Sequence, residues 1–150
     1  MNTKPLAIIA ILLWVASAAF VGFKFVKGNT ESAVDGREAI VLSSAERTLV
    51  LGEMRGMLMA VQEIIAGVNA GDMDAVKESA HRVGMAEAGN APPGLILKLP
   101  MDFKELGFAT HEGFDSIALA AEMGPEAVLE TLEDHMAKCI GCHESYSFTE

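Results

Sequence analysis

Residues 6–23 run without a single charged side chain, which no other stretch of this sequence approaches. Phe25 and Val26 extend the apolar character, and only Lys24 interrupts it. A helix of this length and composition is long enough to cross the hydrocarbon core of a bilayer. We therefore expect residues 1–27 to form a single transmembrane anchor.

The same segment also fits a cleavable signal peptide. Lys4 would be its basic start, residues 6–15 its apolar stretch and Ala16-Ser17-Ala18 its cleavage site. We favour the retained anchor because residues 20–23 continue the apolar run beyond that site. Under the alternative the chain would be soluble after cleavage, and under both the remainder is exported.

The remainder of the chain is strongly acidic. The whole chain has 11 basic and 21 acidic side chains and a formal charge of −10. Three of the lysines lie within residues 1–27, which hold no acid, so the rest carries a charge of about −13. Such a surface argues against nucleic acid as a partner and favours encounter with a basic patch on another protein.

Residues 28–37 are rich in Gly, Asn, Thr, Ser and Asp and predict a flexible tether. Residues 38–150 then form one domain. No stretch of this domain shows sustained alternation of apolar and polar residues, so we expect no strands and an all-α fold.

Four helices account for this domain. We expect them over residues 38–69, 73–88 and 100–123 and from Pro125 onward, with breaks at glycines and prolines. Short turns between them predict an up-down-up-down four-helix bundle behind the single transmembrane helix. The first helix has the clearest apolar seam: Val50, Met54, Met57, Val61, Ile64 and Val68.

The two cysteines of the chain lie in one short motif, Cys139-Ile140-Gly141-Cys142-His143. This C-x-x-C-H sequence is typical of covalent haem c attachment. Thiols one helical turn apart can add to the two vinyl groups of the porphyrin, and the adjacent imidazole can face the iron. We therefore expect one covalent haem c on Cys139 and Cys142, with His143 as an axial ligand to iron.

Two other uses of this motif fit less well. A redox dithiol favours a helix N-terminus in a β-α-β unit, whereas this motif ends a helix of an all-helical chain. A zinc site would need a fourth ligand such as His135, and four ligands along one helix cannot surround a metal tetrahedrally. Haem c is normally attached on the outer face of the bacterial inner membrane, so we expect the domain in the periplasm.

The motif and the Glu144-Ser145-Tyr146 that follows match a Cys-His-acid-x-Tyr pattern. In this pattern and in the order of its helices the chain resembles the family of cytochrome c prime and cytochrome c556, which is related in fold to cytochrome b562. The resemblance covers roughly 110 residues, but only the C-terminal motif is specific. Ser147 departs from the basic residue that usually follows the tyrosine.

The resemblance implies that a first-helix residue meets the iron opposite His143. A methionine there gives a six-coordinate iron suited to electron transfer, whereas Leu or Phe leaves the iron open to small gases. Met54 is the first candidate, because it lies on the apolar seam at the matching distance from the helix end. Met57 follows, and Met59 comes last because it groups with polar residues.

Three further side chains complete the expected site. Tyr146 can pack on the haem edge, and Arg55 can pair with a haem propionate because its guanidinium suits carboxylates. His111 is a minor candidate for the opposite axial ligand, while we expect His81 and His135 to be ordinary surface or capped core histidines.

These features predict a membrane-tethered monohaem c-type cytochrome that passes single electrons between redox proteins and is not an enzyme. One alternative is a five-coordinate protein that binds nitric oxide or carbon monoxide. The other is an accessory haem subunit of a larger membrane redox complex. The resemblance also implies that a homodimer through the first two helices is an open alternative.

Overall fold

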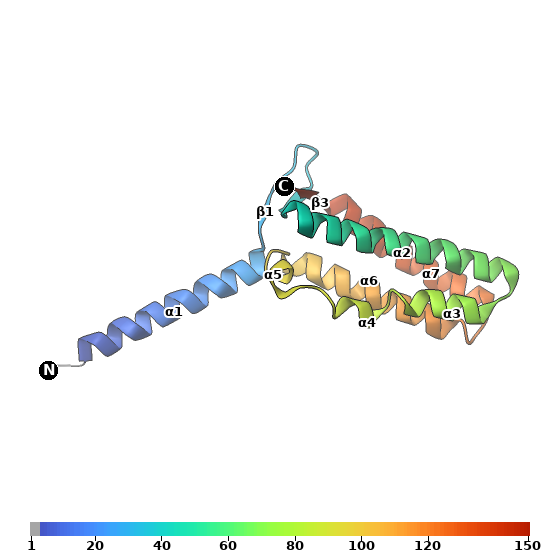
Figure 1. Ribbon diagram of the computed structural model, residues 1–150, viewed down its shortest axis with the longest axis horizontal. Helices are drawn as coiled ribbons and strands as arrows, with labels where there is room; N and C mark the ends of the chain where they lie inside the picture. Colours follow the sequence, from blue (N-terminus) through green and yellow to red (C-terminus); the bar gives the residue numbers. More distant parts are fainter. Residues whose placement is uncertain (1–3) are drawn as a thin grey trace.

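The computed structural model describes residues 4–150, which are mostly helical and form seven helices and three short strands (Figure 1). An isolated N-terminal helix is followed by a small sheet and a body of packed helices. The helices are α1 (Lys4–Lys27), α2 (Ser44–Ala70), α3 (Met73–His81), α4 (Met85–Ala88), α5 (Pro93–Ile96), α6 (Met101–Ala120) and α7 (Pro125–Ser145). The strands are β1 (Thr30–Ser32), β2 (Glu38–Val41) and β3 (Tyr146–Thr149).

Helix α1 projects away from the rest of the molecule (Figure 1). The most apolar 18-residue window within residues 5–27 has a mean hydropathy of 2.5, and none of that window is buried by the protein. Trp14, for example, is 72 % exposed. The predicted apolar N-terminal helix is therefore confirmed, and its length and composition suit either a membrane span or a signal sequence.

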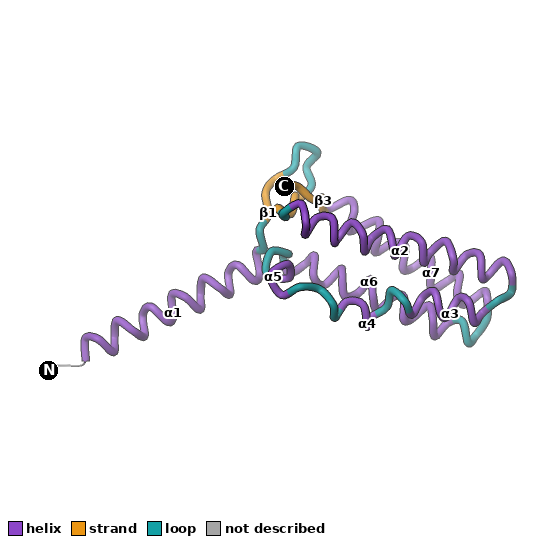
Figure 2. The backbone as a smooth tube through the Cα atoms, in the orientation of Figure 1, coloured by secondary structure: helices purple, strands orange, loops and turns teal. Residues whose placement is uncertain are grey.

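The expectation of a mostly helical domain is confirmed, but the expectation of no strands is wrong, because a three-stranded sheet pairs the segment before α2 with the segment after α7 (Figure 2). Strands β1 and β2 pair antiparallel, and β2 pairs parallel with β3. The predicted tether, residues 28–37, therefore contains a strand and a turn. Strands this short show no alternation long enough to detect, and β2 gains its parallel partner from the far end of the sequence.

Helix α2 begins at Ser44, six residues later than predicted, because Ser43 forms a capping box with Glu46. The Ser43 amide donates to the Glu46 carboxylate at 2.8 Å, and the Glu46 amide donates to the Ser43 hydroxyl at 3.4 Å. Hydrogen bonds from Lys98 and Ser43 lower the pKa of the Glu46 carboxyl to about 2. The preceding residues are thereby free to form β2, in which Ile40 is fully buried.

The predicted second helix, residues 73–88, is divided into α3 and α4. Gly84 lies at the break, and a side chain there would overlap the Asp115 carboxylate of α6. That carboxylate accepts hydrogen bonds from the Met85 amide at 3.0 Å and lies 3.3 Å from the His81 ring. The polar groups freed at the break are thus satisfied by Asp115.

The other predicted boundaries hold closely. Helix α2 ends at Ala70, Gly71 adopts a left-handed conformation with φ of 72°, and Asp72 caps α3. Helix α3 packs against α2 and α6, and α6 packs along α7. The core between these helices contains side chains with no exposed surface: Ala60, Ile64, Val76, Ala80, Phe114, Ile117, Ala118 and Val128.

Candidate functional site

The C-x-x-C-H motif occupies the last two turns of α7. That helix begins at Pro125, which suits the first helical position because its ring fixes φ and it has no amide hydrogen to leave unpaired. Cys139 and Cys142 are half-buried and unbonded to each other, whereas His143 is exposed. The helix therefore turns both thiols partly toward the protein.

Cys142 packs against a group of apolar side chains that we call the motif cluster. Its buried members come from β2 and the residue after it, the start of α2, α5 and the start of α6, and they are Ile40, Leu42, Val50, Leu95 and Phe103. Met54, Leu99, Cys142, Tyr146 and Phe148 pack around them. The Phe103 ring lies edge-on to Tyr146 at 5.3 Å and to Phe148 at 5.7 Å.

The three candidate methionines have different surroundings. Met54 packs against the motif cluster, as Cys142 does. Met57 packs against the separate core around Ile64, and Met59 is 61 % exposed. Of the three, the structure therefore brings Met54 to the same apolar cluster as a cysteine of the motif.

Tyr146 and Arg55, the two other residues predicted to contact haem, lie in different surroundings. Tyr146 belongs to the motif cluster, and burial, together with the nearby carboxylates of Asp102 and Glu38, raises the pKa of its phenol. Arg55 is exposed on α2. The structure thus joins Tyr146 to the site and leaves Arg55 at the surface.

Both thiols are held in their protonated form. Burial raises the pKa of Cys139, and burial together with the neighbouring Cys139 raises the pKa of Cys142. A redox-active dithiol relies instead on a thiol pKa lowered by its surroundings. Among residues 4–150 no three His, Cys, Asp or Glu side chains are arranged to hold a metal ion on their own, so the zinc ligands considered above are not gathered.

Sequence reasoning missed Arg37, which binds the end of the motif. Its guanidinium donates to the carbonyl oxygens of His143 at 3.2 Å and Tyr146 at 3.1 Å, and it is held by the Asp35 carboxylate at 2.7 Å. Carbonyl oxygens at a helix C-terminus lack hydrogen-bond donors within the helix, so Arg37 provides the donors that they need. No local pattern marks this residue, because its partners lie more than a hundred positions away.

Two histidines lie deeper in the helical body than the motif. His111 is buried, with Nδ1 2.8 Å from the Val83 carbonyl oxygen and Nε2 3.2 Å from Glu53. Burial lowers the pKa of His111, but these partners outweigh it and raise the pKa overall. Both ring nitrogens of His111 are thus engaged, which argues against its minor role as an iron ligand.

His135 is 1 % exposed, and neither of its ring nitrogens has a hydrogen-bond partner among residues 4–150. Its ring lies 4.3 Å from that of Phe114 and against Gly113. Burial, with Lys138 and His111 nearby, lowers the pKa of His135 to about 4. The prediction that His135 is a surface or capped histidine is therefore wrong, because apolar packing leaves it uncapped.

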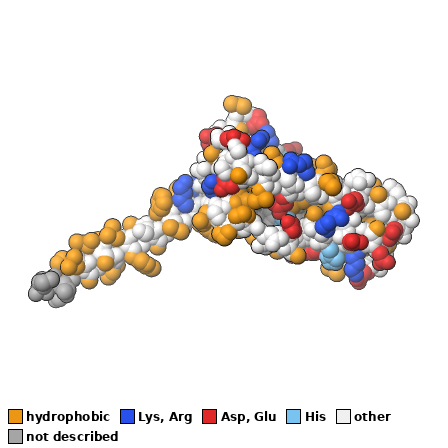
Figure 3. All heavy atoms as spheres, in the orientation of Figure 1, with side chains coloured by type: hydrophobic (Ala, Val, Ile, Leu, Met, Phe, Trp, Pro, Cys, Tyr) orange, Lys and Arg blue, Asp and Glu red, His pale blue; other side chains and the backbone are white. Residues whose placement is uncertain are grey.

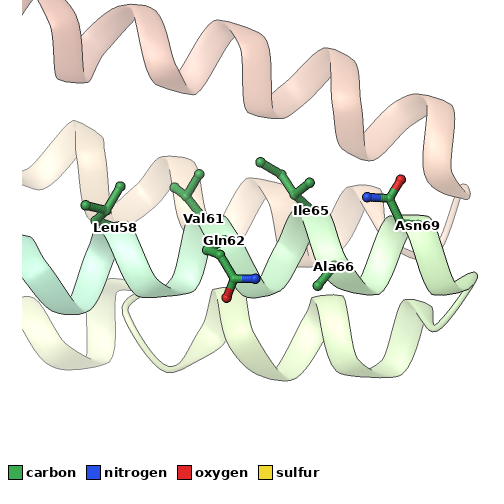
Figure 4. A pocket seen from close by; sticks show the side chains of 6 residues that line it. All are labelled: Leu58, Val61, Gln62, Ile65, Ala66 and Asn69. Atoms are coloured by element: carbon green, nitrogen blue, oxygen red, sulfur yellow. The ribbon is translucent and has the colours of Figure 1, made fainter.

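An open apolar groove on α2 lies apart from the motif. Its lining comes entirely from that helix (Figure 4): Leu58, Val61, Gln62, Ile65, Ala66 and Asn69. Leu58 is 67 % exposed and Ile65 43 % exposed. Since Gln62 and Asn69 are its only polar side chains and none of the lining is charged, the groove is better suited to apolar contact than to catalysis.

The motif end of the molecule therefore collects two protonated thiols, an imidazole, a thioether and a phenol beside an apolar cluster. Comparisons with known protein families, with curated proteins and with solved structures find no match to this chain. What this site does has to be inferred from its own residues.

Proposed function

We propose that this protein is a membrane-tethered monohaem c-type cytochrome that passes single electrons between periplasmic or membrane redox partners. The observation that carries the proposal is the position of Cys142, which packs with Met54 and Tyr146 against one apolar cluster at the end of α7. A haem-attachment sequence is thus combined with the apolar surface that a porphyrin requires.

The residues fit haem c in their chemistry. Cys139 and Cys142 would each form a thioether with a vinyl group, and their protonated thiols suit that addition. His143 would supply one nitrogen to the iron, and Met54 would supply a sulfur ligand. When bound, the haem supplies one-electron chemistry between ferrous and ferric iron, while the protein sets its potential through these ligands and the surrounding apolar side chains.

We propose that the helical body is an up-down-up-down four-helix bundle. Helices α3 and α4 then count as one interrupted helix, and α2, α6 and α7 are the other three. The packing of α3 between α2 and α6, and of α6 along α7, supports this arrangement. It is also the arrangement of the cytochrome c prime and cytochrome c556 family that the sequence resembles.

The proposed location is the bacterial inner membrane, with α1 as a single-pass anchor and the haem domain in the periplasm. The exposed apolar surface along α1 supports the anchor, because water is a poor solvent for it. The mass of the purified protein tests this location. A mass that includes residues 1–18 supports the anchor, and loss of those residues would instead support a soluble periplasmic protein.

The acidic surface and the α2 groove support two kinds of partner. Asp and Glu side chains are spread over the helical body (Figure 3), and this acidic surface suits a redox protein with a basic docking surface. The groove around Leu58 and Ile65 is where we place a homodimer or a contact with a larger redox complex.

Absorption spectra of the wild type, Met54→Ala, Met57→Ala and Met59→Ala test the proposed site. We expect a covalent haem with a low-spin spectrum in the wild type, which turns high-spin only in Met54→Ala. The exposed Met59 serves as the matched control. A high-spin ferrous wild type that binds carbon monoxide rapidly would replace the electron carrier with the gas-binding alternative, and absence of haem would overturn both.

A further inference from the structure

We propose that α5 and the residue that follows it, Leu97, rest on the phospholipid surface, so that the motif end of the helical body faces the membrane. This inference depends on the proposed anchoring by α1 but does not depend on haem. It replaces a domain on a flexible tether with a domain seated directly on the bilayer.

The end of α1 is fixed to the helical body with no free linker between them. The Lys104 ammonium donates to the Phe25 carbonyl oxygen at 2.6 Å and lies 3.8 Å from the centre of the Phe25 ring. Lys104 is only 6 % exposed. A buried lysine that satisfies a helix C-terminus and also contacts an aromatic ring holds both elements in one orientation.

A second connection begins one residue after α1. The Asn29 amide donates to the Lys98 carbonyl oxygen at 2.7 Å. Gly28 has a φ of 69°, and a side chain on it would overlap the backbone of Pro100. Because only glycine fits this approach, the chain leaves α1 pressed against the segment between α5 and α6.

Helix α5 has one side turned to the protein and one to the solvent. Leu95 is 4 % exposed and belongs to the motif cluster, whereas Leu97 is 50 % exposed. Phe25 and Val26, at the end of α1, are 38 % and 57 % exposed. Apolar side chains continue from α1 onto the adjoining end of the helical body (Figure 3), which makes one apolar surface.

The partner that this surface fits is the bilayer that α1 crosses. Lys24 and Lys27 in the last turn of α1 mark the level of the headgroups, where lysine side chains commonly end a span. Lys98 follows Leu97 directly, and its carbonyl oxygen accepts the hydrogen bond from Asn29, which lies two residues after Lys27. Leu97 therefore lies at the membrane surface, and the motif cluster lies directly behind α5.

The position of the motif end at the membrane surface determines which redox partners can reach it. A group held by Cys139 and Cys142 would lie close to the headgroups rather than at the outer end of the helical body. Its electrons would then be exchanged with a partner that is itself embedded in or attached to the membrane.

Cysteine labelling of the full-length, haem-loaded chain in phospholipid nanodiscs tests the proposal. Leu97→Cys is compared with Leu129→Cys, because Leu97 and Leu129 are 50 % and 48 % exposed and Leu129 lies in the first turns of α7, at the opposite end. A charged, membrane-impermeant maleimide is used, labelled sites are located by peptide mass spectrometry, and each rate is normalised to that of the same variant unfolded in detergent.

We expect Leu97→Cys to react several-fold more slowly than Leu129→Cys. A flexible Gly-Ser insert between Lys27 and Gly28, combined with Lys104→Met to remove the hydrogen bond to Phe25, should abolish most of this difference, because the two changes release the helical body from the anchor. Equal rates without the insert, or protection unchanged by it, would overturn the proposal. If Leu97→Cys lacks native helical circular dichroism, Pro93→Cys on the exposed side of α5 takes its place.

The same samples separate this proposal from the proposed function. A haem c spectrum with equal labelling rates overturns the membrane seating alone. A chain without haem that still shows the slow rate at position 97 overturns the cytochrome and leaves the seating supported.

Discussion

Gly113 of α6 lies against the ring of His135 of α7, so closely that a methyl group on Gly113 would overlap the imidazole Nδ1. The contact joins the two longest helices of the C-terminal half, and neither ring nitrogen of His135 gains a hydrogen bond from it. At this point α6 and α7 are therefore held together by van der Waals packing and not by a hydrogen bond.

Gly113→Ala should destabilise the protein by about 1–3 kcal/mol, because the added methyl group has to displace a buried ring. Gly107→Ala is the matched control, since it lies on the same helix and its added methyl group meets no atom within 4 Å. That control should be neutral or slightly stabilising, because alanine favours helix over glycine. Urea unfolding followed by circular dichroism measures both, and equal midpoints would contradict the contact.

The pH dependence of the free energy of unfolding should show the effect of burying His135. Its pKa is lowered to about 4 by burial, so the native protein binds this proton only below about pH 4, whereas the unfolded chain binds it below about pH 6.5. Stability is therefore lost as the pH falls from about 6.5 toward 4, by about 3 kcal/mol.

His135→Leu removes this titration, so its stability should fall less than that of the wild type over the same pH range. The difference between the two unfolding curves isolates His135 from the carboxylates that also titrate there. His111 acts in the opposite sense, because its raised pKa gives stability that is lost as the pH rises through that pKa. Parallel curves for wild type and His135→Leu would show that the ring is not buried as described.

Replacing Lys104 should loosen the joint between α1 and the helical body. Lys104→Met keeps much of the apolar stem but removes the donor to the Phe25 carbonyl oxygen, which costs about 1–3 kcal/mol when that group is left unpaired. Lys77→Met is the control, because Lys77 pairs with Glu122 on the exposed surface at 2.6 Å and such exposed pairs contribute little to stability. Thermal unfolding should show the larger loss for Lys104→Met.

Arg37→Ala should free the end of α7. It removes the donors to the His143 and Tyr146 carbonyl oxygens, so we expect local opening of β3 to become several-fold faster. Hydrogen exchange in a peptide that covers residues 146–149 measures this change. Arg47→Ala provides the comparison, since Arg47 reaches only Glu150 at 3.9 Å, and equal exchange in the two variants would argue against the role of Arg37.

The helices were predictable because their signals are local. Gly71 and Asp72 end one helix and cap the next, Pro125 begins α7, and the Val50 to Val68 seam faces the core as its period requires. The break at Gly84 was not predictable in the same way. It depends on the carboxylate of Asp115, which reaches the turn from another helix.

Part of the candidate site was also readable from the sequence. The motif at the end of α7 and the preference for Met54 over Met59 both follow from spacing, and the structure packs Met54 and Cys142 against the same apolar cluster. That Met54 binds iron stays a prediction. The contributions of Phe103 and Leu95 could not be foreseen. They reach the cluster only through the packing of α5 and α6, which no short pattern describes.

The parallel pairing of β2 with β3 gives the molecule an order of assembly. Strand β1 can join β2 as a local hairpin, but Glu38 cannot meet Tyr146 until everything between them has been synthesised and the helices have returned the chain to its starting point. Contacts this distant in sequence form slowly, because a long loop must close first. We therefore expect β3, which directly follows the helix that carries Cys139 and Cys142, to pair with β2 late in folding.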